Sequence, residues 1–180
     1  MNCRILAVRL LRMNLFELIK SDIRAKAEWV YGDCLRKSIV KTLVTDGTFA
    51  MVVYRLMQWS QKQGLSPLAM LFNKLNVWFG RCIIGRGADF GPAFVLIHSH
   101  GVVINSSVQA GQGIKIEHQV TIGAERNESP VLGDNLFIGA GAKIIGGVTI
   151  GRNVKIGANA VVTKSLPDNV TAVGIPARIV

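Results

Sequence analysis

The three histidines of the chain, His98, His100 and His118, all fall within the stretch Leu96–Ile122. An unperturbed imidazole has a pKa of about 6.5, so it is largely neutral near pH 7 and can accept a proton from a hydroxyl group. General-base chemistry at one of these histidines is therefore the first activity that the sequence suggests. Their distribution does not match a three-histidine metal site shared between subunits, so we expect no metal.

The histidines lie within a run of six-residue repeats. A helix face would repeat every three or four residues and a half-buried strand every two, whereas period six fits a three-sided parallel β-helix. A two-residue slip falls between the units at Leu96 and Ile104, in the loop that holds His98. Residues displaced from a regular coil can project into a cleft. Apolar residues begin the units at Ile84, Phe90, Leu96, Ile104, Ala110, Ile116, Ile122, Leu132, Ile138, Ile144, Ile150, Ile156 and Val162.

Several segments of this half resemble the serine acetyltransferase family of hexapeptide acyltransferases. They are HSHGVVIN, HQVTIGA, LGDNLFIGAGAKIIGGVTIG, VKIGANAVVTKSLPDN and the closing VGIPARIV. The resemblance implies a left-handed coil of about eighteen residues per turn and acetyl transfer from acetyl-CoA to a hydroxyl. We therefore expect a mainly β protein, with an N-terminal helical segment over residues 1–82 and a left-handed parallel β-helix over 83–180.

By this resemblance, His98 occupies the position of the family's catalytic histidine and would be the general base. His118 follows one coil later, about 5 Å along the axis, and two interpretations of it stay open. It could bind the acceptor, or it could be a turn histidine satisfied by the backbone. The remaining acceptor-binding or auxiliary candidates are His100, Glu117, Asn105 and Arg126.

The acyl donor would need a groove lined by small residues, because larger side chains would block the pantetheine arm. Basic side chains near it could bind the phosphates of coenzyme A. By resemblance, the small lining residues are Gly123, Ala124, Ala140 and Ala158, and the basic candidates are Lys143, Lys164 and Arg178.

The sequence departs from the serine-specific pattern. Ile83 stands where the family has the aspartate that pairs with the histidine, and Ile97 where an aspartate contacts the amino acid. The loop Arg126–Pro130 is shorter than the family's arginine-bearing segment. We therefore expect a saccharide hydroxyl as acceptor and the colanic-acid acetyltransferases as the nearest relatives. Serine O-acetyltransferase is the alternative, and N-acetylation of an amino sugar is third.

Replacement of the aspartate by Ile83 leaves open what orients His98. The sequence offers a backbone carbonyl, Glu117 or Asp89 for this role. A non-catalytic trimeric scaffold is the alternative from another class, since a scaffold would keep the repeats without needing His98.

The chain has 180 residues and a formal net charge of +10, most of it in the first 82 residues. Met1–Arg12 is basic and amphipathic, which fits either a helix packed on the assembly or weak contact with a membrane surface. No signal peptide, apolar span or cysteine framework is recognisable, so we expect a cytoplasmic protein. We expect a homotrimer, either alone or paired as a dimer of trimers, and no nucleic-acid partner.

Helix signals occur before the repeats. Asn14 and Glu17 resemble a capping box that opens a helix ending before Gly32. A turn at Thr45–Thr48 precedes a second helix that ends near Gly64, and a third is expected from a Ser66 cap to Gly80. These helices should cover the open end of the coil, because an uncapped solenoid exposes its last layer.

Overall fold

The computed structural model describes residues 13–180, so the expectation for Met1–Arg12 lies outside the described part. The described helices are α2 (Leu15–Tyr31), α3 (Arg36–Leu43), α4 (Thr48–Lys62) and α5 (Ser66–Trp78). The capping box at Asn14 is confirmed, and α2 ends at Gly32 with φ 74°. Helix α3 is not foreseen by the sequence patterns, and Ser66 is the first residue of α5 rather than its cap.

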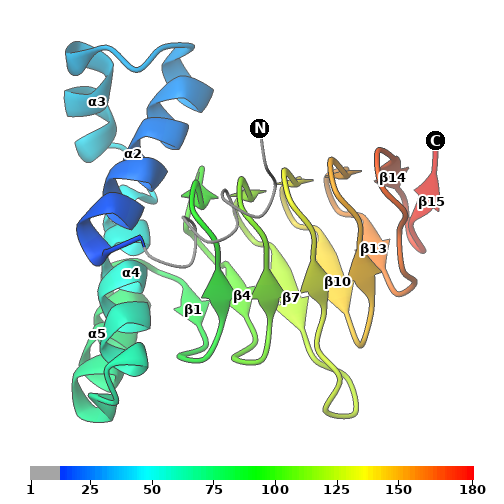
Figure 1. The fold of residues 1–180 in the computed structure, drawn as a ribbon. Coiled ribbons are helices and arrows are strands. Elements are labelled where there is room, and N and C mark those ends of the chain that lie inside the picture. Colours follow the sequence, from blue (N-terminus) through cyan, green and yellow to red (C-terminus); the bar gives the residue numbers. More distant parts are fainter. Residues whose placement is uncertain (1–12) are drawn as a thin grey trace, which may run out of the picture.

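The rest of the described chain is a parallel β-helix whose strands form three sheets (Figure 1). Sheet A contains β1 (Ile83–Ile84), β4 (Val103–Ile104), β7 (Thr121–Gly123), β10 (Lys143–Ile145) and β13 (Val161–Val162). Sheet B contains β2 (Asp89–Phe90), β5 (Gln109–Ala110), β8 (Val131–Leu132) and β11 (Thr149–Ile150). Sheet C contains β3 (Val95–Leu96), β6 (Lys115–Ile116), β9 (Phe137–Ile138), β12 (Lys155–Ile156), β14 (Thr171–Val173) and the antiparallel β15 (Arg178–Ile179). The predicted parallel β-helix is confirmed, and its left-handed sense stays a prediction from the resemblance.

The six-residue period places one aliphatic side chain of each strand inside the coil. Ile84 pairs with Ile104, which pairs with Ile122, and Ile122 pairs with Ile144, so these side chains stack along the axis. All four are at most 1% exposed. Burying an isoleucine side chain is worth roughly 1.5–3 kcal/mol, so the repeat is also the main source of coil stability. The coil that follows β7 is longer than the others, because residues 124–130 form a projecting loop (Figure 1).

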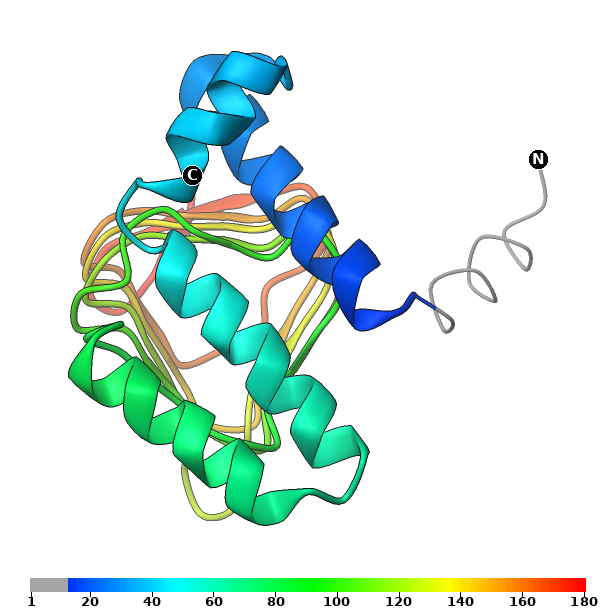
Figure 2. The ribbon, with the colours of Figure 1, turned by 90° about the vertical axis from the view of Figure 1, so that its left-hand side faces the viewer.

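Helices α2, α4 and α5 lie across the first coil and close its end, as Figure 2 shows in a view along the coil. Tyr54 of α4 is fully buried there, and its hydroxyl donates to the carbonyl oxygen of Ala88 at 3.0 Å. The predicted cover is thus confirmed. Within residues 13–180, none of the helices combines the length and the apolar character needed to cross a membrane.

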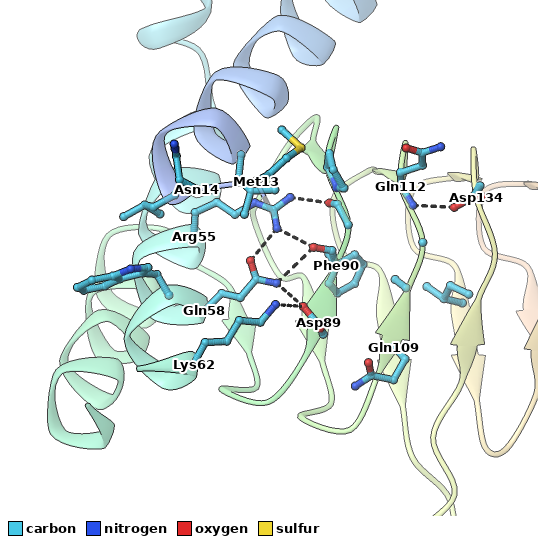
Figure 3. Close-up of a pocket in the computed structure, with 18 of the residues that line it drawn as sticks. Met13, Asn14, Arg55, Gln58, Lys62, Asp89, Phe90, Gln109, Gln112 and Asp134 are labelled. Atoms are coloured by element: carbon cyan, nitrogen blue, oxygen red, sulfur yellow. Dashed lines mark hydrogen bonds and ion pairs between the residues drawn. The ribbon is translucent and has the colours of Figure 1, made fainter. Parts of the chain in front are cut away.

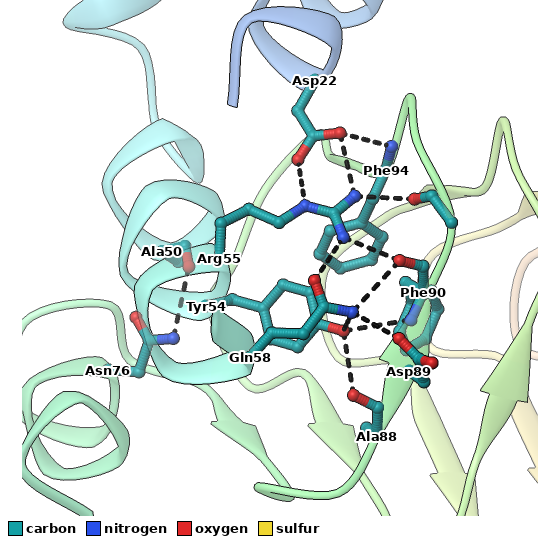
Figure 4. Close-up of polar contacts among 11 residues, drawn as sticks. Asp22, Ala50, Tyr54, Arg55, Gln58, Asn76, Ala88, Asp89, Phe90 and Phe94 are labelled. Atoms are coloured by element: carbon teal, nitrogen blue, oxygen red, sulfur yellow. Dashed lines mark hydrogen bonds and ion pairs between the residues drawn. The ribbon is translucent and has the colours of Figure 1, made fainter. Parts of the chain in front are cut away.

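A buried ion pair fastens this cover to the coil (Figure 4). The guanidinium of Arg55 in α4 donates to both carboxylate oxygens of Asp22 in α2, at 2.7 and 3.0 Å. It also donates to the carbonyl oxygens of Phe90 and Gly91 at the first coil, at 2.7 and 2.6 Å. Asp22 in turn accepts from the backbone N–H of Phe94 at 3.0 Å. Two helices and the coil therefore share one network.

Candidate functional site

The histidines gather at one corner of the triangular coil, where turns lead from sheet C to sheet A. We call the turns at residues 97–102, 117–120, 139–142 and 157–160 the histidine corner. His98 and His118 occupy successive turns, with ring centroids 6.0 Å apart and planes at 73°. The backbone N–H of Gln119 donates to the carbonyl oxygen of His100 at 2.9 Å, which fixes the register of the two turns. The predicted placement of His118 one coil after His98 is confirmed.

The carboxylate nearest to His98 comes from the helical segment. Asp46 Oδ2, in the turn between α3 and α4, lies 3.0 Å from His98 Nδ1. Both side chains are about half exposed, at 53% for His98 and 57% for Asp46. The sequence patterns predict only a turn at residues 45–48 and do not mark Asp46 as a site residue.

Neither of the two carboxylates that the sequence offered for His98 faces it. Asp89 lies on sheet B, where its carboxylate accepts from Gln58 Nε2 at 2.6 Å and from Lys62 Nζ at 3.0 Å. Glu117 Oε2 lies 3.6 Å from Nδ1 of His118, so it faces the second histidine rather than the first. Asp46 is 52 positions away from His98 in the chain, and no local pattern in the sequence links the two.

The histidine corner also contains part of the predicted donor groove. Ala140 and Ala158 follow His118 on the next two turns, where the N–H of Gly141 donates to the carbonyl oxygen of His118 and that of Asn159 to the carbonyl of Ala140. Lys143 on β10 reaches back to this corner, since its Nζ donates to the carbonyl oxygen of Gln119 at 2.7 Å. His100 is exposed beside them.

Other predicted residues lie at the next corner, where sheet A leads to sheet B. Asn105 follows β4, Gly123 ends β7 and Ala124 comes directly after it, and Lys164 follows β13. Arg126 is exposed on the projecting loop and has a positive φ of 51°. A sheet-A strand separates this corner from the histidine corner by roughly 15 Å, at about 3.3 Å per residue. One chain therefore does not bring these residues to His98.

Asn105 has a different set of contacts from those expected of an acceptor ligand. Its Oδ1 accepts from the backbone N–H of Ser107 at 2.9 Å and from the hydroxyl of Ser129 at 3.1 Å. It thereby ties the projecting loop to the coil. Arg178, on β15, pairs with Val173 at the far end of sheet C.

A separate groove of about 790 Å³ runs between the helices and sheet B (Figure 3). Its polar lining includes Arg55, Gln58, Lys62, Asp89 and Gln109. None of the predicted catalytic, acceptor-binding or cofactor-binding residues lines it. Of its charged side chains, Lys62 is paired with Asp89 and Arg55 with Asp22. In residues 13–180 no three His, Cys, Asp or Glu side chains are grouped so as to hold a metal ion.

Comparison with known proteins shows which transferases this chain resembles. Residues 129–164 match the family described as Bacterial transferase hexapeptide (six repeats). A serine acetyltransferase of Bacillus pumilus is 32% identical over 170 residues, which cover 92% of this chain and 77% of that protein. The soybean serine acetyltransferase complexed with serine superposes with a TM-score of 0.83 at 31% identity, covering 92% of this chain and 69% of that one. A serine acetyltransferase in complex with CoA superposes with a TM-score of 0.84 at 29% identity, covering 92% of this chain and 70% of that one.

The parallel coil and the matched repeats define a hexapeptide-repeat transferase. The chain belongs, within that class, to the serine acetyltransferase family, as its likeness to the Bacillus pumilus enzyme shows. The expected closer likeness to the colanic-acid acetyltransferases finds no support, since these relatives are serine acetyltransferases.

Proposed function

We propose that the protein is an O-acetyltransferase that moves the acetyl group of acetyl-CoA to the hydroxyl of L-serine. Family membership supports the donor and the reaction, and the serine-bound relative supports the acceptor. The observation that carries the proposal is the pairing of His98 Nδ1 with a carboxylate at the histidine corner. This pairing leaves the other ring nitrogen, Nε2, free to act on a substrate.

His98 acts as the general base in this reaction. An alcohol is a weak nucleophile until its proton is being removed. Nε2 of His98 accepts the hydroxyl proton while the oxygen attacks the thioester carbonyl carbon. The C–S bond then breaks, the acetyl ester forms, and the thiolate of coenzyme A leaves and takes the proton that His98 accepted, which restores the neutral imidazole. His118, stacked on His98, binds the acceptor.

The two sets of predicted residues fit a site between subunits. Ala140, Ala158 and Lys143 belong to the histidine corner, whereas Gly123, Ala124 and Lys164 lie at the next corner. In a homotrimer, one chain's histidine corner meets the other corner of a neighbour, and together they line the groove for acetyl-CoA. Arg126 on the neighbour's projecting loop then faces the acceptor carboxylate, and Lys143, Lys164 and Arg178 are the candidates for the phosphates.

The structure also weakens the main argument against serine. Ile83 and Ile97 remove two of the family's carboxylates, but Glu117 lies at the histidine corner and Asp46 lies beside it. Glu117 is 22% exposed and offers a carboxylate to the ammonium group of an amino acid. Charged partners of this kind are what a zwitterionic acceptor requires.

A saccharide hydroxyl is the second candidate acceptor. Ile97, directly before His98, is partly exposed and apolar, and it cannot provide the charged contact of the family's aspartate. A site with fewer charged partners suits a neutral acceptor, whose hydroxyls need only neutral hydrogen-bond partners.

An acceptor panel distinguishes the two. Release of coenzyme A is measured with L-serine, free sugars and nucleotide sugars, with His98→Ala as the inactive control. We expect kcat/KM for L-serine on the order of 10⁵ M⁻¹s⁻¹, which is ordinary for a dedicated enzyme, and at least about 10³-fold lower values for sugars. A sugar that outcompetes serine would establish the second candidate.

The non-catalytic scaffold makes a different prediction. Titration calorimetry with coenzyme A tests it directly, because a scaffold has no donor groove. Failure to bind coenzyme A, together with no acetyl transfer to any acceptor of the panel, would refute the enzyme proposal.

A further inference from the structure

The orienting carboxylate of His98 has a different origin in this chain from that in the family pattern. Ile83 occupies the position of the family's aspartate, and its side chain is apolar and 50% exposed. Asp46 Oδ2, from the turn between α3 and α4, lies on Nδ1 of His98 instead. We propose that Asp46 is the positioning residue of His98, held in place by Lys26 and Gly47, so that the helical segment completes the active site. This inference rests on the proposed role of His98 as base.

Both oxygens of the Asp46 carboxylate have defined partners. Oδ1 accepts from the backbone N–H of Gly47 at 2.9 Å, and Oδ2 faces His98 at 3.0 Å. A carboxylate can only accept, so a hydrogen bond at Oδ2 requires the proton of the neutral imidazole to be on Nδ1. The lone pair is then on Nε2, which is the arrangement that a general base needs.

Lys26 ties the turn that bears Asp46 to the strand end that bears His98. Its ammonium group, from α2, donates to the carbonyl oxygen of Asp46 and to those of Leu96 and Ile97, at 2.8 and 3.4 Å for the latter two. Lys26 is only 1% exposed. Burying a lysine is costly unless its donors are satisfied, and here they bind the two backbone segments whose spacing sets the Asp46–His98 contact.

Gly47 allows the two segments to approach closely. It has a φ of 79°, and a Cβ at this position would lie 2.4 Å from the carbonyl oxygen of Leu96. That oxygen is one of the acceptors of Lys26. Any side chain at position 47 would therefore push the turn away from the strand end and pull Asp46 from the imidazole.

An ordinary surface ion pair is the alternative explanation of the Asp46–His98 contact. Exposed ion pairs contribute little to stability, so stability alone does not explain a buried lysine and a constrained glycine at one contact. Orientation of the imidazole does explain them. The helical segment would then be required for catalysis as well as for covering the coil.

The tautomer of His98 gives a test that does not depend on activity. In protein labelled with nitrogen-15 at histidine, long-range proton–nitrogen correlation spectra distinguish a proton on Nδ1 from one on Nε2. Only three histidines are present, and the variants His98→Ala, His100→Ala and His118→Ala assign their signals. We expect the Nδ1–H form for neutral His98 and its loss as the dominant form in Asp46→Asn. A tautomer that is unchanged in Asp46→Asn would overturn the proposal.

Steady-state kinetics test whether loss of the Asp46 carboxylate slows acetyl transfer. We expect Asp46→Asn to lower kcat about 10- to 100-fold, less than a fully buried triad aspartate, with little change in the KM of L-serine or acetyl-CoA. Asp46→Glu should recover part of the rate. Asp33→Asn is the matched control, because it removes another carboxylate of the helical segment while its Oδ1 can still accept from the Leu35 N–H.

Other kinetic outcomes would have different meanings. A raised KM for serine with an unchanged kcat would make Asp46 an acceptor ligand and refute the positioning role. Full activity of His98→Ala would refute the proposed function itself, whereas the tautomer measurement would still decide whether Asp46 orients the ring.

Gly47→Ala tests the geometry without removing either side chain. Both Asp46 and His98 remain, so only their separation changes. We expect the same loss of the Nδ1–H form as in Asp46→Asn, in protein whose circular dichroism shows intact helices. Retention of the wild-type tautomer in folded Gly47→Ala would show that the close approach of the turn is not needed.

Discussion

The guanidinium of Arg55 donates two hydrogen bonds to the carboxylate of Asp22 where α4, α2 and the first coil meet. Their side chains are 0% and 1% exposed. Both partners also bind backbone groups of the coil, so the pair couples the position of the helices to that of residues 90–94. The turn that carries Asp46 directly precedes α4 and is bound to α2 through Lys26, so its position depends on how these two helices dock.

Removing one member of this pair should destabilise the protein strongly. Arg55→Met or Asp22→Leu alone leaves a buried charge without a partner, which typically costs about 3–5 kcal/mol. The double variant should lose less unfolding free energy than the sum of the losses in the two single variants. Urea denaturation followed by circular dichroism measures each free energy of unfolding. Strict additivity would contradict a direct pairing.

Lys26 should make stability depend on pH in the alkaline range. Burial lowers the pKa of Lys26 from its ordinary value of 10.5 to about 8, with the Asp46 charge opposing the shift. Between about pH 8 and 10.5 the unfolded chain therefore binds more protons at this site than the folded one, and the free energy of unfolding rises with pH.

Comparison with Lys26→Met isolates this contribution. The difference in unfolding free energy, wild type minus variant, should increase by on the order of 3 kcal/mol from pH 7 to 10.5. Denaturant titrations at fixed ionic strength measure it. A difference that stays constant with pH would show that Lys26 does not titrate in this window.

The two stacked histidines should differ in their kinetic effects. His98→Ala should lower the rate of acetyl transfer by about 10²-fold or more, because the general base is lost. His118→Ala should be milder and should act mainly on the KM of the acceptor. Steady-state assays that vary serine and acetyl-CoA separately would distinguish the effect on kcat from the effect on the KM of the acceptor. Equal losses of kcat in both variants would indicate that His118 also takes part in proton transfer.

Assembly should be required for activity if the site lies between subunits. We expect a trimer of about 58 kDa from chains of 19.5 kDa, or a dimer of such trimers. Homo-oligomers usually have closed symmetry. Light scattering measures the mass, and activity is followed as the protein is diluted. A monomer with full activity would refute a shared site.

The sequence by itself determined the coil and the place of the histidines. The aliphatic period of six specifies which side chains point inward, and the coil register then follows from stacking those side chains on one another. The same register places His98 and His118 on neighbouring turns, which is how their proximity could be predicted from spacing alone. The capping box at Asn14 is equally local and was equally readable.

Only the tertiary structure decided what faces His98. Asp46 is 52 positions away in the chain, and Lys26 is 70 positions from its acceptor Leu96. These contacts depend on how α2 and the turn before α4 dock on the first coil, and no periodic pattern encodes that arrangement. The division of the predicted residues between two corners likewise follows from strand topology rather than from motif content. Local repeats fix the solenoid because each coil contacts only its neighbours, whereas the site depends on packing between segments far apart in sequence.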